Sequence, residues 1–109
     1  MGSIQNDRSK EVKMSVQFNK LISRLQDSGS PYERTEIMQA AVSQYMFTCQ
    51  QLGVILMHMR YSSEREAVAA MMAPRIVDPE NAHTQLLPFI ACESLIVRGK
   101  ILNSIESAS

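Results

Sequence analysis

Hydrophobic residues recur along this chain every three or four positions, which is the spacing of an α-helix with one buried face. The pattern is most complete in the middle of the chain, where Leu52, Ile55, Leu56 and Met59 occupy positions i, i+3, i+4 and i+7. Alternation of apolar and polar residues never continues long enough to indicate a strand. We therefore predict an all-α chain. Its five or six short helices are expected over residues 9–28, 31–45, 48–60, 63–73, 79–87 and 91–106.

Four short polar sequences mark helix starts. In the first, the Ser30 hydroxyl is expected to accept a hydrogen bond from the Glu33 amide while the Glu33 carboxylate reaches back to the Ser30 amide, with Pro31 at the first helical position. The same pattern predicts starts at Thr48 with Gln51, at Ser63 with Glu66, and at the acidic cap Asp78 with Pro79.

Two glycines lie inside predicted helices, and each costs about 1 kcal/mol relative to alanine. We expect Gly53 and Gly99 to be compensated by the close approach of another helix. Gly99 belongs to the apolar positions of the last helix, which are Cys92, Leu95, Ile96, Gly99, Leu102 and Ile105.

The chain also shows weak self-similarity. Tyr32-Glu33-Arg34 aligns with Ser63-Glu64-Arg65 at a separation of 31, and with the degraded copy Cys92-Glu93-Ser94 a further 29 residues on. A period near 30 with two helices per unit is typical of stacked helical hairpins, and the short connections favour antiparallel neighbours. We predict about three stacked antiparallel hairpins in one domain over residues 8–106, with a disordered or tag-derived segment 1–7 and a frayed end 107–109.

Several runs resemble a known family. These are Phe47–Leu52, Ile55-Leu56, Arg60–Arg65 and Ile76–Asn81, and together they look like the domain-of-unknown-function family 4476, a small helical module of repeated aromatic-x-x-Glu/Asp-Arg units. The resemblance covers about residues 30–105, and it departs from the pattern in the third unit, where Ser94 replaces the arginine and Ile90 the aromatic residue. It implies a helical fold, and it implies no catalytic residues, because the family has none established.

Charge and composition exclude some classes of partner. The 109 residues carry eleven Lys plus Arg against eleven Asp plus Glu, so the net charge is zero, which does not indicate a dedicated nucleic-acid binder. A modest basic excess lies on the first helix, in Lys10, Lys13, Lys20 and Arg24. Binding of a polyanion there, a membrane surface or a nucleic acid, is the alternative function that the sequence leaves open.

The predicted location is cytoplasmic. No apolar run approaches the roughly 20 residues needed to span a bilayer, and the first residues lack the apolar stretch of a signal peptide. The chain has only two cysteines, Cys49 and Cys92, and a reducing compartment suits so few.

Candidate chemistry is sparse. His58, His83, Cys49 and Cys92 are the only histidines and thiols, and no pair of them has metal-ligand spacing. Cys49 falls in the first turn of its helix, where the dipole can lower a thiol pKa, but neither histidine can be placed beside it as a base. We therefore predict no enzyme, no metal and no cofactor.

The remaining candidates indicate recognition of another protein. Six of the eight methionines fall in the second to fourth helices, where they either fill the core or line a groove. Arg34 and Arg65 are equivalent positions that either line a face for an acidic peptide or tie adjacent hairpins together. We predict a non-catalytic protein–protein interaction module that binds another protein or itself, with no small-molecule substrate. Its candidate contact residues are Met57, Arg60, Tyr61, Arg34 and Arg65.

Overall fold

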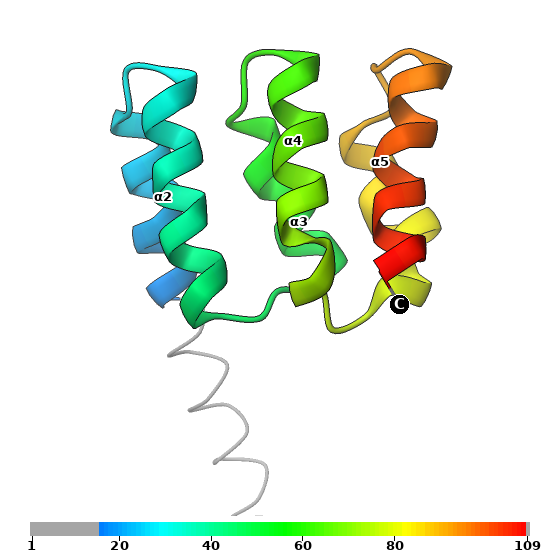
Figure 1. Cartoon of the computed structure of the whole chain (residues 1–109), viewed down its shortest axis with the longest axis horizontal. Coiled ribbons are helices and arrows are strands. Elements are labelled where there is room, and N and C mark those ends of the chain that lie inside the picture. The colour runs from blue at the N-terminus through cyan, green and yellow to red at the C-terminus, as the bar shows by residue number, and fades with distance from the viewer. Residues whose placement is uncertain (1–15, 109) are drawn as a thin grey trace, which may run out of the picture.

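The structure, a computed structural model, describes residues 16–108 and shows three antiparallel helical hairpins standing side by side (Figure 1). The predicted all-α class is confirmed. Hairpin 1 comprises helical residues 16–27 and α2 (Pro31–Gln44), and hairpin 2 comprises α3 (Cys49–Met57) and α4 (Ser62–Met72). Hairpin 3 comprises residues 79–89 and α5 (Leu95–Ala108).

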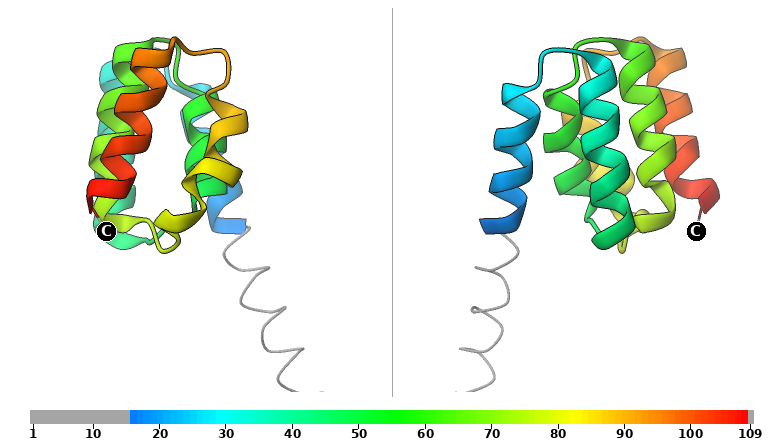
Figure 2. Two further views of the ribbon diagram at one scale, coloured as in Figure 1. Left: turned by 90° about the vertical axis from the view of Figure 1, so that its right-hand side faces the viewer. Right: turned by 60° about the vertical axis from the view of Figure 1, so that its left-hand side comes forward.

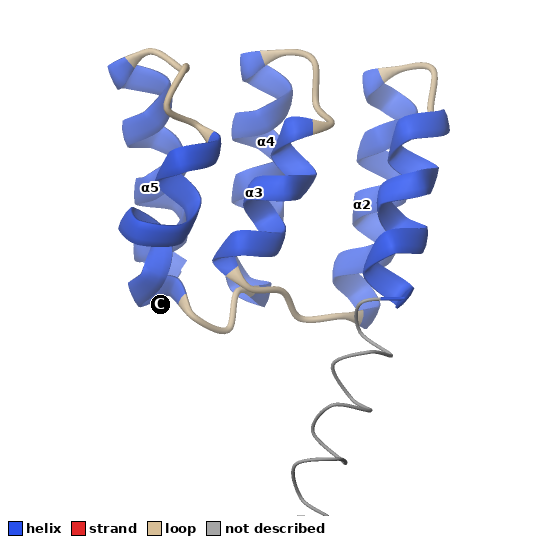
Figure 3. Cartoon of the chain, turned by 180° about the vertical axis from the view of Figure 1, so that it is seen from behind, coloured by secondary structure: helices blue, strands red, loops and turns tan. Residues whose placement is uncertain are grey.

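The hairpins build two layers of helices (Figure 2). One layer holds α2, α4 and α5, and the other holds residues 16–27, α3 and residues 79–89; Figure 3 shows the same arrangement from behind. The turns inside the hairpins, at 28–30, 58–61 and 90–94, all lie at one end of the array, which we call the turn end. The segments that lead from one hairpin to the next, 45–48 and 73–78, lie at the opposite, connector end.

The core lies between the layers and follows the predicted helical period. Leu52, Ile55, Leu56 and Met59 are all buried, as the spacing predicted. The same cluster includes buried residues from every hairpin, such as Leu25, Met72 and Ile101. Because each hairpin shares this cluster with its neighbour, the hairpins form one continuous core.

Two of the four predicted helix starts use their side chains as caps. The Thr48 hydroxyl accepts from the Gln51 amide at 3.1 Å, and the Gln51 side chain accepts from the Thr48 amide at 3.0 Å, which completes the predicted capping box. At the first start, the Ser30 hydroxyl accepts from the Glu33 amide at 3.1 Å. The Glu33 carboxylate differs from the prediction, because it accepts from the amide of Gly29 at 2.9 Å instead of that of Ser30.

The other two predicted caps are wrong. Helix α4 begins one residue earlier than expected, after Tyr61, and has no side-chain cap. Asp78 does not cap the segment that follows it, because its carboxylate accepts from the Cys49 amide of hairpin 2 at 2.8 Å and from the Asn81 side chain at 3.1 Å.

Hairpin 3 also departs from regular α-helix in its first half. Residues 79–89 form a 3₁₀ turn (Pro79–Asn81), a π-helical turn (Ala82–Leu86) and a second 3₁₀ turn (Leu87–Phe89). Pro79 and Pro88 lie in the two 3₁₀ turns, and neither can donate the backbone hydrogen bond of a continuous α-helix. Helix α5 begins later than the predicted position 91, because the Ser94 hydroxyl accepts from the Val97 amide at 3.2 Å and caps it there. At its other end α5 continues to Ala108, past the predicted 106, and residues 1–7 lie outside the described part of the chain.

The two helical glycines have different surroundings. A Cβ atom added at Gly53 would overlap the ring of Phe89 from hairpin 3, which confirms the expected close approach. Nothing lies within 4 Å of a Cβ added at Gly99, so the same expectation is wrong there. Gly53 therefore forms part of the contact between hairpins 2 and 3, whereas Gly99 does not form such a contact.

Replacing each glycine by alanine distinguishes a glycine that is packed against another hairpin from one that is not. We expect Gly53→Ala to lower the free energy of unfolding by about 1–3 kcal/mol, because the new methyl group displaces the Phe89 ring. Gly99→Ala, the matched control, is expected to raise it by about 0.5–1 kcal/mol through helix propensity alone. Urea denaturation measures both, and a Gly53→Ala variant as stable as Gly99→Ala would contradict the close packing.

Candidate functional site

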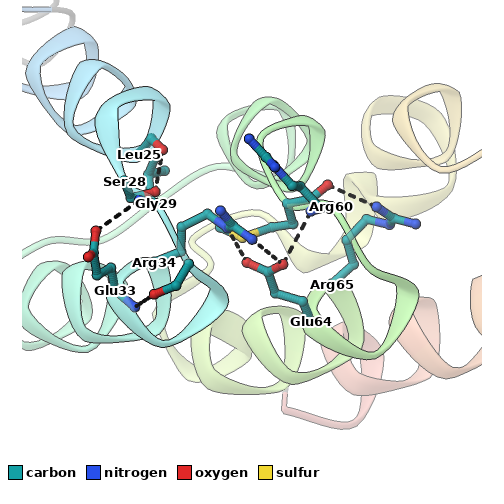
Figure 4. A network of polar contacts seen from close by, with 10 residues as sticks. Leu25, Ser28, Gly29, Glu33, Arg34, Arg60, Glu64 and Arg65 are labelled. Atoms are coloured by element: carbon teal, nitrogen blue, oxygen red, sulfur yellow. Dashed lines mark hydrogen bonds and ion pairs between the residues drawn. The ribbon is translucent and has the colours of Figure 1, made fainter.

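A buried ion pair joins hairpins 1 and 2 near the turn end (Figure 4). Arg34 of α2 and Glu64 of α4 are both buried. The guanidinium uses Nε and Nη2 to reach both carboxylate oxygens, with the Nη2–Oε1 distance at 2.9 Å. The carboxylate also accepts from the Arg60 amide at 3.2 Å. Two parallel charge-assisted bonds of this kind fix geometry as well as charge.

The electrostatics of this pair favour its ionised form. The hydrogen bond to Glu64 raises the pKa of Arg34 above its ordinary value, although burial alone would lower that pKa. For Glu64, burial alone would raise the pKa, but hydrogen bonds from Arg34 and from the Arg60 amide outweigh it and lower the pKa below its ordinary value. Both groups are therefore charged at neutral pH.

A second junction of the same kind joins hairpins 2 and 3. Arg65 of α4 makes an ion pair with Glu93, which precedes α5, and it donates to the carbonyl of Met59 at 2.9 Å. The Ser62 hydroxyl also donates to the Glu93 carboxylate, at 2.8 Å. Of the two roles considered for Arg34 and Arg65, the structure shows the one in which they tie adjacent hairpins together.

The connector end is joined through the main chain. The Phe47 amide donates to the Arg75 carbonyl at 2.8 Å, and the Val77 amide donates to the Phe47 carbonyl at 2.9 Å. The Arg75 side chain reaches back to the last turn of α2 and donates to the Val42 carbonyl at 2.6 Å. A cation at a helix C-terminus is favoured by the helix dipole, so Arg75 stabilises the end of α2 and fixes the connectors together.

Cys49 is buried in the junction between hairpins 2 and 3. Its thiol donates to the Asp78 carbonyl at 3.1 Å. Burial and the nearby Asp78 charge raise the pKa of this thiol to about 12. The lowering of the thiol pKa that was expected from the helix dipole is outweighed by burial and by Asp78. The thiol is therefore protonated at neutral pH. Cys49 therefore serves packing and hydrogen bonding, while Cys92 is a free, exposed thiol.

The two histidines lie in hairpins 2 and 3. His83 is exposed and contacts the Glu106 carboxylate at 2.5 Å, and His58 is half-buried at the end of α3. Within residues 16–108, no group of three or more His, Cys, Asp or Glu side chains is placed to hold a metal ion. In the same range, no helix has the length and apolar character needed to cross a membrane.

Large apolar side chains are exposed at the turn end. Met57 is 65% exposed and Tyr61 57% exposed, and Arg60 between them is also exposed. We call the exposed large apolar residues at this end of the three hairpins the turn-end patch, which consists of Tyr32, Met57, Tyr61, Leu95 and Ile96; Tyr45, Met46 and Val77 are exposed at the connector end.

The helix positions of these residues explain why they share one end. Tyr32 lies in the first turn of α2, Leu95 and Ile96 open α5, and the starts of these helices point the same way as that of α4 (Figure 1). The assignment of Leu95 and Ile96 to the apolar face of the last helix is wrong. The buried face of α5 passes through Ile101 and Ile105, and at about 100° of rotation per residue Leu95 and Ile96 lie on other sides of the helix. Cys92, placed on the same face by the spacing, is also exposed.

The structure divides the predicted contact residues into two groups. Met57, Arg60 and Tyr61 are exposed together at the turn end, whereas Arg34 and Arg65 are held in the two ion pairs. Met57 lies off the apolar stripe of its helix, as expected. The other methionines of the middle helices are mainly internal: Met38, Met59 and Met72 are buried, Met71 is half-buried, and Met46 is exposed.

A groove of about 540 Å³ lies in hairpin 1 toward the connector end. Residues 16–27 and α2 form its sides, and the first residues of hairpin 2 close one part of it. Sequence reasoning missed this groove, although the adjacent small residues Ala40 and Ala41 signal it. Its lining residues are Gln17, Phe18, Lys20, Leu21, Arg24, Ala40, Ala41, Gln44, Tyr45, Met46, Phe47 and Gln51.

The basic residues of the first helix are only partly covered by the structure. Lys20 and Arg24 are exposed along the groove, and they also border a more open hollow with Val16, Asn19 and Ser23. Lys10 and Lys13 lie outside the described residues.

One family model matches this chain. It is the model described as Domain of unknown function (DUF4476), and it matches residues 12–91. The match thus includes all of the helical residues 16–27 and ends before α5, whereas the resemblance seen in the sequence was placed at about 30–105. Searches of curated proteins and of solved structures gave no significant match.

The buried pair gives a prediction for stability. We expect Glu64→Gln to lower the free energy of unfolding by about 3 kcal/mol, because it leaves the Arg34 guanidinium buried without a counter-charge. The pair of the exposed Lys100 with the half-buried Glu66, at 3.6 Å, supplies the control, and Glu66→Gln is expected to cost less than about 1 kcal/mol. Equal losses in urea denaturation would show that the Arg34 pair is not a junction.

The lowered pKa of Glu64 also gives a pH dependence. Because its pKa in the folded protein lies below that in the unfolded chain, the ionised pair stabilises the fold above the unfolded pKa of about 4.3. This contribution is lost as the pH falls through the lower, folded pKa. Between about pH 5 and pH 3, the unfolding free energy should fall more steeply for the wild type than for Glu64→Gln; parallel curves would contradict the assignment.

The two thiols should differ in reactivity. We expect iodoacetamide at mildly alkaline pH to alkylate Cys92 in the native protein and to leave Cys49 unmodified, because its thiol is buried and protonated. Peptide mass spectrometry before and after denaturation measures this difference. Alkylation of Cys49 in the native state at the rate of Cys92 would be incompatible with the described contact to Asp78.

Proposed function

The chain belongs to the DUF4476 family, and we propose that this member is a non-catalytic module for protein–protein interaction that binds through the turn-end patch. One observation carries the proposal: all three hairpins expose large apolar side chains at the same end of the array. Leu95 and Ile96 are 77% and 72% exposed, and Tyr32 is 71% exposed. Clustered exposed apolar residues with a polar surround are typical of contact sites between proteins.

The composition of the patch supports this proposal. Two of its five members are tyrosines and one is a methionine, and aromatic residues and methionine are enriched at interfaces. Tyrosine combines apolar area with a polar hydroxyl and few rotatable bonds, so it loses little entropy on binding. Met57 adds a flexible side chain that adapts to the shape of a partner.

The support beneath the patch is rigid. Glu64 binds the Arg60 amide, next to Tyr61, and Glu93 lies two residues before Leu95 in the ion pair with Arg65. The two Arg–Glu junctions thus hold the turns that carry the patch in fixed relative positions. A preorganised surface lowers the entropic cost of association.

The proposal also covers the origin of the three hairpins and the location of the protein. We infer that the three hairpins are copies of one repeated unit, which is supported by the two Arg–Glu junctions at corresponding places. We also propose a cytoplasmic location, which is supported by the free thiol of the exposed Cys92.

A site-specific photo-crosslinker tests the patch. With benzoylphenylalanine in place of Met57 or Tyr61, irradiation of cells that make the full chain should yield the same crosslinked protein, or a crosslinked dimer of this chain, from both positions. The matched control is Gln50, an exposed residue at the connector end. Crosslinks of equal yield from Gln50, or none from the patch at concentrations where light scattering also shows a monomer, would overturn the proposal.

The alternative function, binding of a polyanion, has its own supporting observation. Lys20 and Arg24 are exposed one turn apart and make no ion pair with any residue in the range 16–108. Binding to heparin or to anionic vesicles would then weaken strongly between about 50 and 500 mM salt, and it would be lost when Lys10, Lys13, Lys20 and Arg24 are replaced by glutamine. Binding that is independent of salt excludes this alternative.

A further inference from the structure

The groove in hairpin 1 exists because two small residues stand where hairpin 2 has large ones. Arg34 and Arg65 correspond at a separation of 31, and the same separation matches Ala40 and Ala41 with Met71 and Met72. In hairpin 2, Met72 is fully buried in the core and Met71 packs against it. Alanine at both positions leaves the corresponding space in hairpin 1 open, which gives the volume of about 540 Å³.

The floor of this groove is apolar. Phe18 and Leu21 face it from the first helix, Ala41 from α2, and Phe47 from the connector to hairpin 2. Leu21, Ala41 and Phe47 are themselves core residues. The floor is thus held in place by the core, so an apolar ligand would meet a preformed surface.

The rim of the groove carries positive charge only. Lys20 and Arg24 line it, four positions apart and therefore on one face of their helix. None of the described residues that line the groove is an aspartate or a glutamate. Since neither cation makes an ion pair with a described residue, both are available to an anionic group.

We propose that this groove binds a single-chain amphiphile, with its aliphatic chain on the apolar floor and its anionic head group at Lys20 and Arg24. The volume lies in the range of about 300–1,000 Å³ that is usual for small-molecule sites. The groove is confined to one hairpin and the start of the next, whereas an amphipathic helix of a partner requires a trough along several turns. This binding site is separate from the turn-end patch, which lies at the other end of the array.

Dodecanoate below its micelle concentration is the probe. Titrated into the ¹⁵N-labelled full chain, it should shift the amide signals of groove residues such as Leu21, Ala41 and Phe47 and leave those of the turn-end patch unchanged. Dodecanol tests the apolar chain alone and acetate the charge alone, and both should bind more weakly than dodecanoate.

Matched variants separate the two parts of the site. Lys20→Gln with Arg24→Gln should weaken dodecanoate binding about five- to tenfold and leave dodecanol binding unchanged. The control removes the same charge elsewhere, through Arg60→Gln with Lys100→Gln, and should bind as the wild type does. Ala40→Met, which copies Met71, should fill the groove and abolish binding of both probes. Ala70→Met, at an exposed position of α4, should have no effect.

Several results would overturn the proposal. These are the absence of dodecanoate binding, shifts centred on the turn-end patch, equal affinity of the Lys20 and Arg24 variant, and binding that survives Ala40→Met. Binding of an acidic amphipathic peptide in the groove without binding of dodecanoate would also overturn it, and would indicate a peptide site. None of these results bears on crosslinking from Met57 or Tyr61, so failure here is distinguishable from failure of the proposed function.

Discussion

The fold depends on the requirement that a buried arginine have a carboxylate partner. Arg34 is almost completely enclosed, and a guanidinium in that position is tolerated only when its charge is balanced and its donors are used. Glu64 satisfies this requirement from the neighbouring hairpin, so the pair holds α2 and α4 together where these two residues meet. The less buried pair of Arg65 with Glu93 does the same at the next junction. Apolar packing supplies most of the stability, and the ion pairs fix the alignment in which that packing occurs.

The two ends of the array are consequently joined by different chemistry. At the turn end the junctions are charged side chains, and at the connector end they are main-chain hydrogen bonds between 45–48 and 75–78, with the Asp78 carboxylate on the Cys49 amide. Joined at both ends, neighbouring hairpins resist rotation as well as separation. A patch formed from the turns of three separate hairpins requires such rigidity, because its residues belong to segments about 30 positions apart in the chain.

The sequence predicted the parts of this structure that are determined by local chemistry. The helical class, the core stripe of α3 and the Thr48 capping box follow from spacing and from side chains that act within a few residues of their own position. The errors arise where a side chain acts across hairpins. Asp78 resembles a cap, but the amide it binds belongs to Cys49, twenty-nine residues away. Leu95 and Ile96 continue an apolar pattern, yet they lie away from the face of α5 that Ile101 and Ile105 bury against the core. Among the candidate contact residues, Met57 was recognisable as a residue off the stripe. The alternatives for Arg34 and Arg65 could be resolved only when the position of the next hairpin was known.

The serine at position 94 interrupts the series of ion pairs that joins the hairpins. Each arginine reaches forward, from one hairpin to the carboxylate of the next, so the series of pairs has a direction. Ser94 occupies the place of the next arginine, and its hydroxyl is used to cap α5. The position of hairpin 3 that corresponds to Arg34 and Arg65 thus offers a carboxylate no positive charge. An ion pair like those at the two earlier junctions therefore cannot form from this position, and a contact made on this side of hairpin 3 must depend on other chemistry.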